Sequence, residues 1–152
     1  MQQQGKVLAF GVSNFMPHQA EVLRQWVPLS YHQLEISVIA QAPFTNGQLD
    51  HCLQHKIVPM AWAPLGGGVF TDDLHPHFRS ITQTATELAE QYGVGINEVL
   101  LAFLNSHPSG ILPVIGTTRI DRLASARKAA NIKLRREDWF LLRKAALGED
   151  VA

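Results

Sequence analysis

Short apolar segments alternate along the chain with stretches in which apolar residues recur every three or four positions. The apolar segments predict strands at 7–12, 31–36, 57–63 and 111–115. The helical spacing predicts helices at 17–26, 49–55, 81–92, 96–104, 120–130 and 139–147. The first helix is predicted to begin at Pro17, with Ala20, Leu23 and Trp26 facing inward. Strands that alternate with helices are typical of a parallel sheet with right-handed crossovers.

The length of the chain limits this fold to half of a barrel. A complete (β/α)8 TIM barrel needs roughly 250 residues, whereas this chain has 152. We therefore predict an α/β fold, half of such a barrel, with four parallel βα units and a C-terminal helix. The segment 57–63 is apolar almost throughout, which predicts a strand covered on both faces. Half a barrel leaves two open sheet edges and an uncovered inner face, so we expect self-association, pairing with another half or poor solubility.

Composition and charge exclude several classes of partner. Lys and Arg together number 13, as do Asp and Glu, so the formal net charge is zero. This balance argues against nucleic acid and against an anionic membrane surface as partners. Cys52 is the single cysteine, and its place on an apolar helix stripe predicts a buried, inert thiol. No secretory signal or membrane-length apolar run is present, so we expect a soluble, cytoplasmic protein.

Polar or aromatic residues stand at the ends of the first three predicted strands. Ser13 and Asn14 could hydrogen-bond a ligand carboxamide, or could cap the helix that begins at Pro17. Gln33 is either a site residue or a hydrogen-bonded amide of the core. Trp62 could stack on a planar heterocycle or could pack in the core. In parallel sheets ligands bind at the carboxyl ends of the strands, where these residues lie.

The segment 116–122 follows the fourth predicted strand and opens the next helix. Its backbone N–H groups, two threonines, Arg119 and Arg122 favour an anion site at the helix N-terminus. The alternative is a threonine cap with solvated arginines. Three glycines, at 66–68, would let a phosphate approach the backbone after the third strand.

Histidines give only incomplete metal-ligand patterns. His51 and His55 lie four residues apart on one predicted helix and could be a ligand pair, but no third ligand stands at a fixed spacing. The residues Asp72, Asp73, His75 and His77 favour a polar loop over a metal site. We therefore predict no metal.

Four strings in the sequence together resemble the C-terminal half of the aldo-keto reductase family, over almost the whole chain. They are Gly11-Val12-Ser13-Asn14-Phe15, Gln33-Leu34-Glu35, Trp62-Ala63-Pro64-Leu65-Gly66 and Ile115-Gly116-Thr117-Thr118 with Arg122. They are similar to the fifth to eighth barrel strands of that family. The tail, 139–148, is similar to a bacterial branch of predicted oxidoreductases.

The resemblance implies an NADPH site along the strand ends. Ser13, Asn14 and Gln33 would hold the nicotinamide carboxamide, and Trp62 would stack on the nicotinamide ring. Ala63, Leu65 and Gly66 would line the path of the pyrophosphate. Gly116, Thr117, Thr118 and Arg122 would bind the adenosine end, where an arginine suits the 2′-phosphate of NADPH. Ala126 is a departure, because the family often has Asn at this position.

The resemblance assigns no catalytic residue to this chain. Family members reduce carbonyl substrates with a Tyr, Lys, Asp and His set from the first four βα units, which these 152 residues do not include. Tyr31 and Tyr92 are the only tyrosines, and neither stands in that context. We therefore expect the cofactor-binding half of an NADPH-dependent oxidoreductase domain over 1–152, a fragment or a split subunit. The alternatives are a non-catalytic nucleotide- or partner-binding half-barrel and an inactive remnant.

Overall fold

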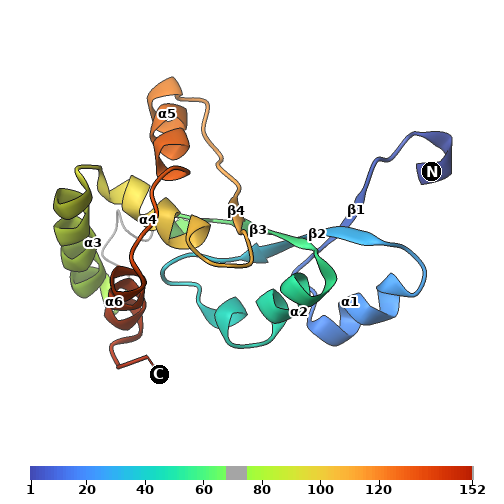
Figure 1. The fold of residues 1–152 in the computed structure, drawn as a ribbon, viewed down its shortest axis with the longest axis horizontal. Coiled ribbons are helices and arrows are strands. Elements are labelled where there is room, and N and C mark those ends of the chain that lie inside the picture. Colours follow the sequence, from blue (N-terminus) through green and yellow to red (C-terminus); the bar gives the residue numbers. More distant parts are fainter. Residues whose placement is uncertain (68–74, 152) are drawn as a thin grey trace.

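The strands of the computed structural model, which describes residues 1–67 and 75–151, form one parallel sheet (Figure 1). They are β1 (Phe10–Ser13), β2 (Leu29–Glu35), β3 (Val58–Trp62) and β4 (Leu112–Pro113). Their order in the sheet is β1-β2-β3-β4, and every neighbouring pair is parallel. The predicted succession of parallel strands is therefore confirmed. Because β1 and β4 each pair with one neighbour, the described sheet has two open edges.

Each predicted helix is present. They are α1 (Pro17–Arg24), α2 (Gln48–His55), α3 (Phe78–Tyr92), α4 (Ile96–Asn105), α5 (Ile120–Ala129) and α6 (Arg136–Leu147). Two short 3-10 helices, η1 (Gln2–Gln4) and η2 (Ala42–Phe44), complete the described elements. In Figure 1, α1 and α2 lie below the sheet, α3 and α6 gather at the left, and α5 projects at the top. No helix in residues 1–67 or 75–151 combines the length and the apolar character that crossing a membrane needs.

The two faces of the sheet differ in burial. His32, Leu34 and Ala61 are fully buried on the face toward the helices. The residues that alternate with them point to the opposite face, where Gln33 and Trp62 are only half-buried. The expectation that the third strand is covered on both faces is therefore wrong, because its burial alternates along β3. The apolar run in β3 therefore includes residues on the face of the sheet that the described chain leaves open.

Two separate hydrophobic cores hold the helices against the sheet. The large core joins β2 and β3 to α3, α4 and α6, and its centre is Phe103, whose ring stacks on Trp139 at 5.0 Å between centroids. The small core lies at α1, α2 and the beginning of β2. Its buried members are Ala20, Leu29, Cys52 and Ile57. The apolar side chains that β1 and α1 add to it are only partly buried, namely Phe10, Val12 and Leu23.

Three sequence predictions about local structure are wrong. Trp26 is 81% exposed because α1 ends at Arg24, before the indole could turn inward. The fourth strand is reduced to Leu112 and Pro113, although the backbone N–H of Val114 still donates to the Ala61 carbonyl oxygen at 2.8 Å. The predicted stripe of α5 is largely outside the core: Ile120 is 83% exposed, and only Ala129 is buried in this helix.

Candidate functional site

The carboxyl ends of β1, β2 and β3 bring four predicted site residues side by side. Ser13 and Gln33 are partners in the β1–β2 register. The backbone N–H of Asn14 donates to the carbonyl oxygen of Gln33 at 2.9 Å. The indole Nε1–H of Trp62 donates to Oδ1 of Asn14 at 3.2 Å, across a separation of 48 residues. This bond uses the amide oxygen of Asn14, so the amide N–H groups are the donors that Asn14 can offer a ligand.

The backbone is strained where β1 and β3 end. Asn14 has a φ of 55° and Ala63 a φ of 47°, both in the left-handed region. Such a conformation costs a non-glycine residue roughly 1–2 kcal/mol, although asparagine tolerates it better than alanine. Strain of this kind persists where the surrounding structure imposes it, which is typical of ligand sites. Ala63 was predicted as a site residue only from its neighbours, and nothing in its own identity indicates this conformation.

Several of the alternatives for the strand-end residues are excluded. The N-cap of α1 is Met16, whose backbone N–H donates to Oε1 of Gln19 at 2.8 Å, so Ser13 and Asn14 do not cap this helix. Gln33 is half-buried on the open face of the sheet and is not an amide of the core. Trp62 lies on the same open face and belongs to neither hydrophobic core.

A cavity of about 410 Å³ begins directly after Trp62. Its walls come from the segment after β3, from α4, from the segment after β4 and from α5. Five predicted site residues line it: Ala63, Leu65, Gly116, Thr117 and Arg122. Gly66 and Thr118 are next to lining residues in sequence but do not line the cavity themselves. Gly68, Asp72 and Asp73 lie outside the described residues.

Sequence reasoning missed two polar residues of this cavity, Asn97 and Ser125. Ser125 follows Arg122 by three residues on α5, so helical spacing could have placed it on the same face. Ala126, the departure from the family pattern, lines the cavity as well. Asn97 is on α4, and no spacing in the sequence links that helix to Arg122.

The two arginines at the beginning of α5 have different surroundings. Arg119 forms a bidentate ion pair with Asp121, with Nε to Oδ1 at 3.1 Å and Nη2 to Oδ2 at 2.6 Å. This hydrogen bonding with Arg119 lowers the pKa of the Asp121 carboxyl below its usual range. Arg122 lines the cavity and forms no ion pair with residues 1–67 or 75–151. The prediction that both guanidiniums converge on an anion is therefore wrong for Arg119.

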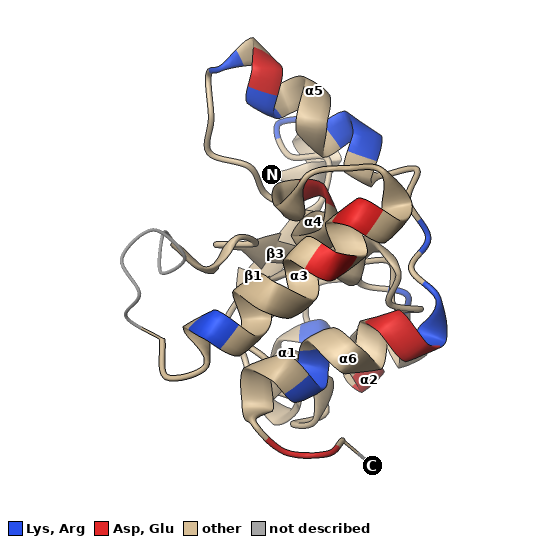
Figure 2. Cartoon of the chain, turned by 90° about the vertical axis from the view of Figure 1, so that its left-hand side faces the viewer, with Lys and Arg blue, Asp and Glu red and all other residues tan. Residues whose placement is uncertain are grey.

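Acidic and basic residues follow one another at this end of α5, as the red and blue ribbon segments of Figure 2 show. The N-cap residue Arg119 makes no capping hydrogen bond with its side chain, but the Asp121 carboxylate accepts the backbone N–H groups of Asp121 and Arg122 in the first turn. Thr117 Oγ1 accepts a hydrogen bond from the backbone N–H of Arg119 at 3.2 Å, which shapes the turn before the helix rather than capping it. Arg122, which lines the cavity, is therefore the group at this end of α5 that can hold an anion.

The profile of the Aldo/keto reductase family matches residues 1–146. The chain belongs to this family. It is 41% identical over 155 residues to Oxidoreductase YdhF of Escherichia coli (strain K12), across 99% of this chain and 51% of that protein. It is 36% identical over 150 residues to a 6-dehydroglucose reductase of Agrobacterium fabrum, across 97% of this chain and 50% of that protein. The chain therefore spans about half the length of the curated relatives that it matches.

Solved structures of aldo-keto reductases share the fold. The thermostable aldo-keto reductase Tm1743, in complex with the inhibitor epalrestat, matches 95% of this chain and 50% of its own with a TM-score of 0.83 and 25% identity. An aldo/keto reductase from Klebsiella pneumoniae, in complex with NADP and acetate, matches 94% of this chain and 50% of its own with a TM-score of 0.78 and 24% identity. The architecture of this aldo/keto reductase chain is thus half of a (β/α)8 barrel.

Tyr92 lies between two helices of this aldo/keto reductase chain, whereas Tyr31 lies on the open face of the sheet, on the same side as Gln33. The Tyr92 hydroxyl donates to Oδ2 of Asp138 at 2.6 Å and accepts the backbone N–H of Arg135 at 3.0 Å, so it joins α3 to α6. Tyr31 is the third residue of β2 and is two positions before Gln33. Its backbone lies against Gly11, where an added Cβ would be 2.8 Å from the Tyr31 carbonyl oxygen. Neither tyrosine lines the cavity.

Proposed function

We propose that the chain is the cofactor-binding half of an NADPH-dependent aldo/keto reductase that acts on carbonyl compounds. The observation that carries the proposal is that the ends of β1 to β3 and the cavity after Trp62 follow one another as one rim. The Asn14–Trp62 hydrogen bond lies at one end, and the cavity that begins at Ala63 has Arg122 in its far wall. The chain belongs to a family of oxidoreductases, and its rim has hydrogen-bond donors at one end and a cation at the other. Together these features favour a dinucleotide as the ligand.

The nicotinamide end of the cofactor fits the residues at the ends of β1 to β3. The amide N–H groups of Asn14 and the side chains of Ser13 and Gln33 would hydrogen-bond the carboxamide. Trp62, fixed by its bond to Asn14, would offer its indole face to the ring. When bound, NADPH supplies a hydride from the exposed face of that ring. The chain's own contribution is to hold the ring in one orientation.

The phosphate-bearing end fits the cavity and the beginning of α5. Leu65 and the strained turn at Ala63 line the approach, with Gly66 beside them. Arg122 would bind the 2′-phosphate, with Gly116, Thr117 and Thr118 around the adenosine. A charge-assisted bond from an arginine without another ion pair favours NADPH over NADH, which lacks this phosphate.

The proton that carbonyl reduction requires would come from outside the described rim. Within residues 1–67 and 75–151, Tyr92 is engaged with Asp138, and Tyr31 is two positions before Gln33, short of the carboxyl end of β2. Acid catalysis and stabilisation of the developing oxyanion are each worth about two to four orders of magnitude in rate. We therefore propose that turnover needs a second half that supplies these groups.

The cofactor proposal is tested by titrating the chain with NADPH and with NADH. Trp26 is 81% exposed, so a Trp26→Phe background lowers unrelated fluorescence and leaves two tryptophans: Trp62 at the site and Trp139 against the large core. We expect NADPH to quench the fluorescence and to bind more tightly than NADH. Arg122→Gln should weaken NADPH binding by at least about tenfold, because a hydrogen bond to a charged group contributes about 1.5–3 kcal/mol. NADH binding should change little.

Arg127→Gln is the matched control, because Arg127 is an exposed arginine on the same helix that does not line the cavity. It should leave NADPH affinity unchanged. A folded sample without an NADPH response would overturn the proposal. Equal NADPH affinities for Arg122→Gln and the unsubstituted chain would remove the proposed phosphate site.

The open face of the sheet favours a further proposal about partners. Tyr31 is 42% exposed on this face, and β1 and β4 are unpaired edges of the described sheet. We propose that a complementary N-terminal half covers the face, and that copies of the chain associate through it when that half is absent. Light scattering during size-exclusion chromatography should show oligomers at micromolar concentration. A monomer that melts cooperatively at every concentration would contradict this.

A further inference from the structure

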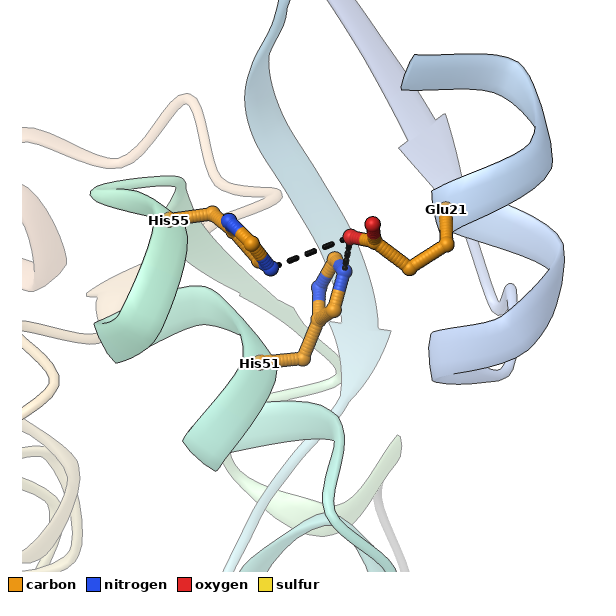
Figure 3. A group of neighbouring side chains, drawn as sticks. All are labelled: Glu21, His51 and His55. Carbon is orange, nitrogen blue, oxygen red and sulfur yellow. Dashed lines mark hydrogen bonds and ion pairs between the residues drawn. The ribbon is translucent and has the colours of Figure 1, made fainter. Parts of the chain in front are cut away.

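Three potential metal ligands from two helices meet on the helical side of the sheet (Figure 3). Glu21 comes from α1, and His51 and His55 come from α2. Oε1 of Glu21 lies 2.7 Å from Nε2 of His51 and 3.0 Å from Nε2 of His55. One ligand atom from each residue lies within 4.8 Å of the others. The histidine pair that lacked a third ligand in the sequence therefore gains one through the packing of α1 beside α2.

The chemistry of this cluster matches that of a zinc site. Two imidazole nitrogens and one carboxylate oxygen form a recurring zinc ligand set, with water in the fourth position. Histidines four residues apart on a helix present their rings on one face, as metal-binding helices require. With bonds of about 2.0–2.2 Å, tetrahedral geometry separates ligand atoms by about 3.4 Å. The distances from the Glu21 oxygen to the two imidazole nitrogens, now 2.7 and 3.0 Å, would therefore lengthen by roughly 0.4–0.7 Å.

The three side chains of the cluster differ in burial, so one ligand is fixed while solvent can still reach the others. His51 is 5% exposed and is held in place by its surroundings, whereas the Glu21 side chain is 48% exposed and can adjust. His55 is 19% exposed, so solvent reaches the side of the cluster where an ion would enter. One fixed ligand with two adjustable ones suits a site that closes around an ion.

One nearby cation opposes metal binding. Arg24 Nη1 lies 2.5 Å from Oε1 of Glu21, the same oxygen that both histidines contact. Arg24 therefore competes for the carboxylate and repels a divalent ion. Because a single oxygen serves three donors, a metal ion can replace the two imidazole contacts while Arg24 moves to the other oxygen.

We propose that Glu21, His51 and His55 form a Zn²⁺ site that ties α1 to α2 above the small core. None of the three residues lines the cavity at α5, so the site is separate from the proposed NADPH rim. The ion would join two helices whose shared core has only a few buried side chains. Its effect would be to stabilise the half of the molecule that carries β1.

The test is a zinc titration of the untagged chain of 152 residues in chelator-treated buffer, followed by calorimetry. Cobalt provides a second readout, because tetrahedral nitrogen and oxygen ligands give Co²⁺ an intense visible absorption. We expect one ion per chain. His55→Ala should weaken binding by at least about tenfold, since even the loss of an outer partner of a metal ligand costs 10–100-fold. His18→Ala, at an exposed histidine of α1 outside the cluster, is the matched control and should bind as the unsubstituted chain does.

His55→Ala is preferred to His51→Ala because the more exposed side chain is less needed for folding, and circular dichroism checks that the variant is folded. Arg24→Gln should tighten zinc binding at least twofold, because it frees the carboxylate. Unchanged zinc affinity in folded His55→Ala, or the absence of zinc binding, would overturn the proposal. Weaker binding by Arg24→Gln would contradict the competition. NADPH affinity is measured in the same samples and should not change when zinc is added. The zinc proposal and the NADPH proposal are therefore tested independently.

Discussion

The large and small cores of the molecule differ in how completely each is enclosed. In the large core, α3, α4 and α6 surround Phe103, and the Phe44 and Trp139 rings pack on it from two directions. In the small core, α1 and α2 cover one side of β1 and β2, and polar groups such as His32 are buried beside Cys52. The large core is self-sufficient, whereas the small core lies next to a sheet edge that lacks a neighbour. We therefore expect the β1 half of the chain to be the less stable part, the one that the proposed partner or ion would stabilise most.

The same substitution in each core gives the largest expected effect. Leu142→Ala removes a fully buried side chain from the large core and should lower the free energy of unfolding by about 4–5 kcal/mol, near the top of the range for leucine. Leu29→Ala, in the small core, should cost about 2–3 kcal/mol because its surroundings can collapse or rehydrate. Urea denaturation measures both. Equal losses would break the comparison.

Acid should weaken the small core through His32. Burial, and secondarily the charge of His51, lowers the pKa of His32 from 6.5 to about 4. Between these values the unfolded chain binds a proton that the folded chain rejects, so stability is complete above pH 6.5 and falls until about pH 4. The loss is at most about 3 kcal/mol.

The measurement is the melting temperature as a function of pH for the unsubstituted chain and for His32→Leu. In His32→Leu, most of the decline in melting temperature between pH 6.5 and 4 should be absent. A decline of equal size in both proteins would show that other groups cause it.

A close backbone contact at β1 should make one glycine irreplaceable. A Cβ at Gly11 would lie 2.8 Å from the carbonyl oxygen of Tyr31, so Gly11→Ala must push β1 away from β2. We expect a loss of about 1–3 kcal/mol, the usual cost of overpacking. Gly116→Ala is the control, because nothing lies within 4 Å of its added Cβ. Thermal unfolding should rank the two variants in this order, and the reverse order would contradict the register of β1.

Labelling of Cys52 should reveal the weaker core directly. Burial raises the pKa of its thiol to about 11, so the folded chain should react slowly with a thiol reagent. We expect the small core to open with a free energy at least about 1.4 kcal/mol below that of global unfolding, a tenfold difference in population. Labelling rates across a urea series measure this opening. If labelling requires complete unfolding, the two cores form one cooperative unit.

The contrast between the regions also explains what the sequence could predict. Helices α3 and α4 follow the predicted periodicity because their apolar faces meet other parts of the large core, as at Ile81, Ala85 and Val99. Trp26 and Ile120 have the same apolar character and are exposed, because the chain ends its helix or turns away before a partner surface is reached. Apolar periodicity predicts which face of a helix is apolar, but it does not predict whether another part of the chain packs against that face.

The candidate sites show the same limit. Asn14, Gln33 and Trp62 were predicted as neighbours because the ends of parallel strands share one edge. Glu21 was missed because it lies 30 residues from His51, and no spacing rule links two separate helices. The pairing of Arg119 with Asp121, which removes one cation from the anion site, likewise could not be predicted from the sequence.

Amide hydrogen exchange with and without NADPH tests most directly whether the strand-end rim is the cofactor site. The account predicts slower exchange at 63–67 and 114–122 when NADPH is present, with no change in α1 or α2. Protection confined to α1 and α2, or no protection anywhere in a folded sample, would contradict it.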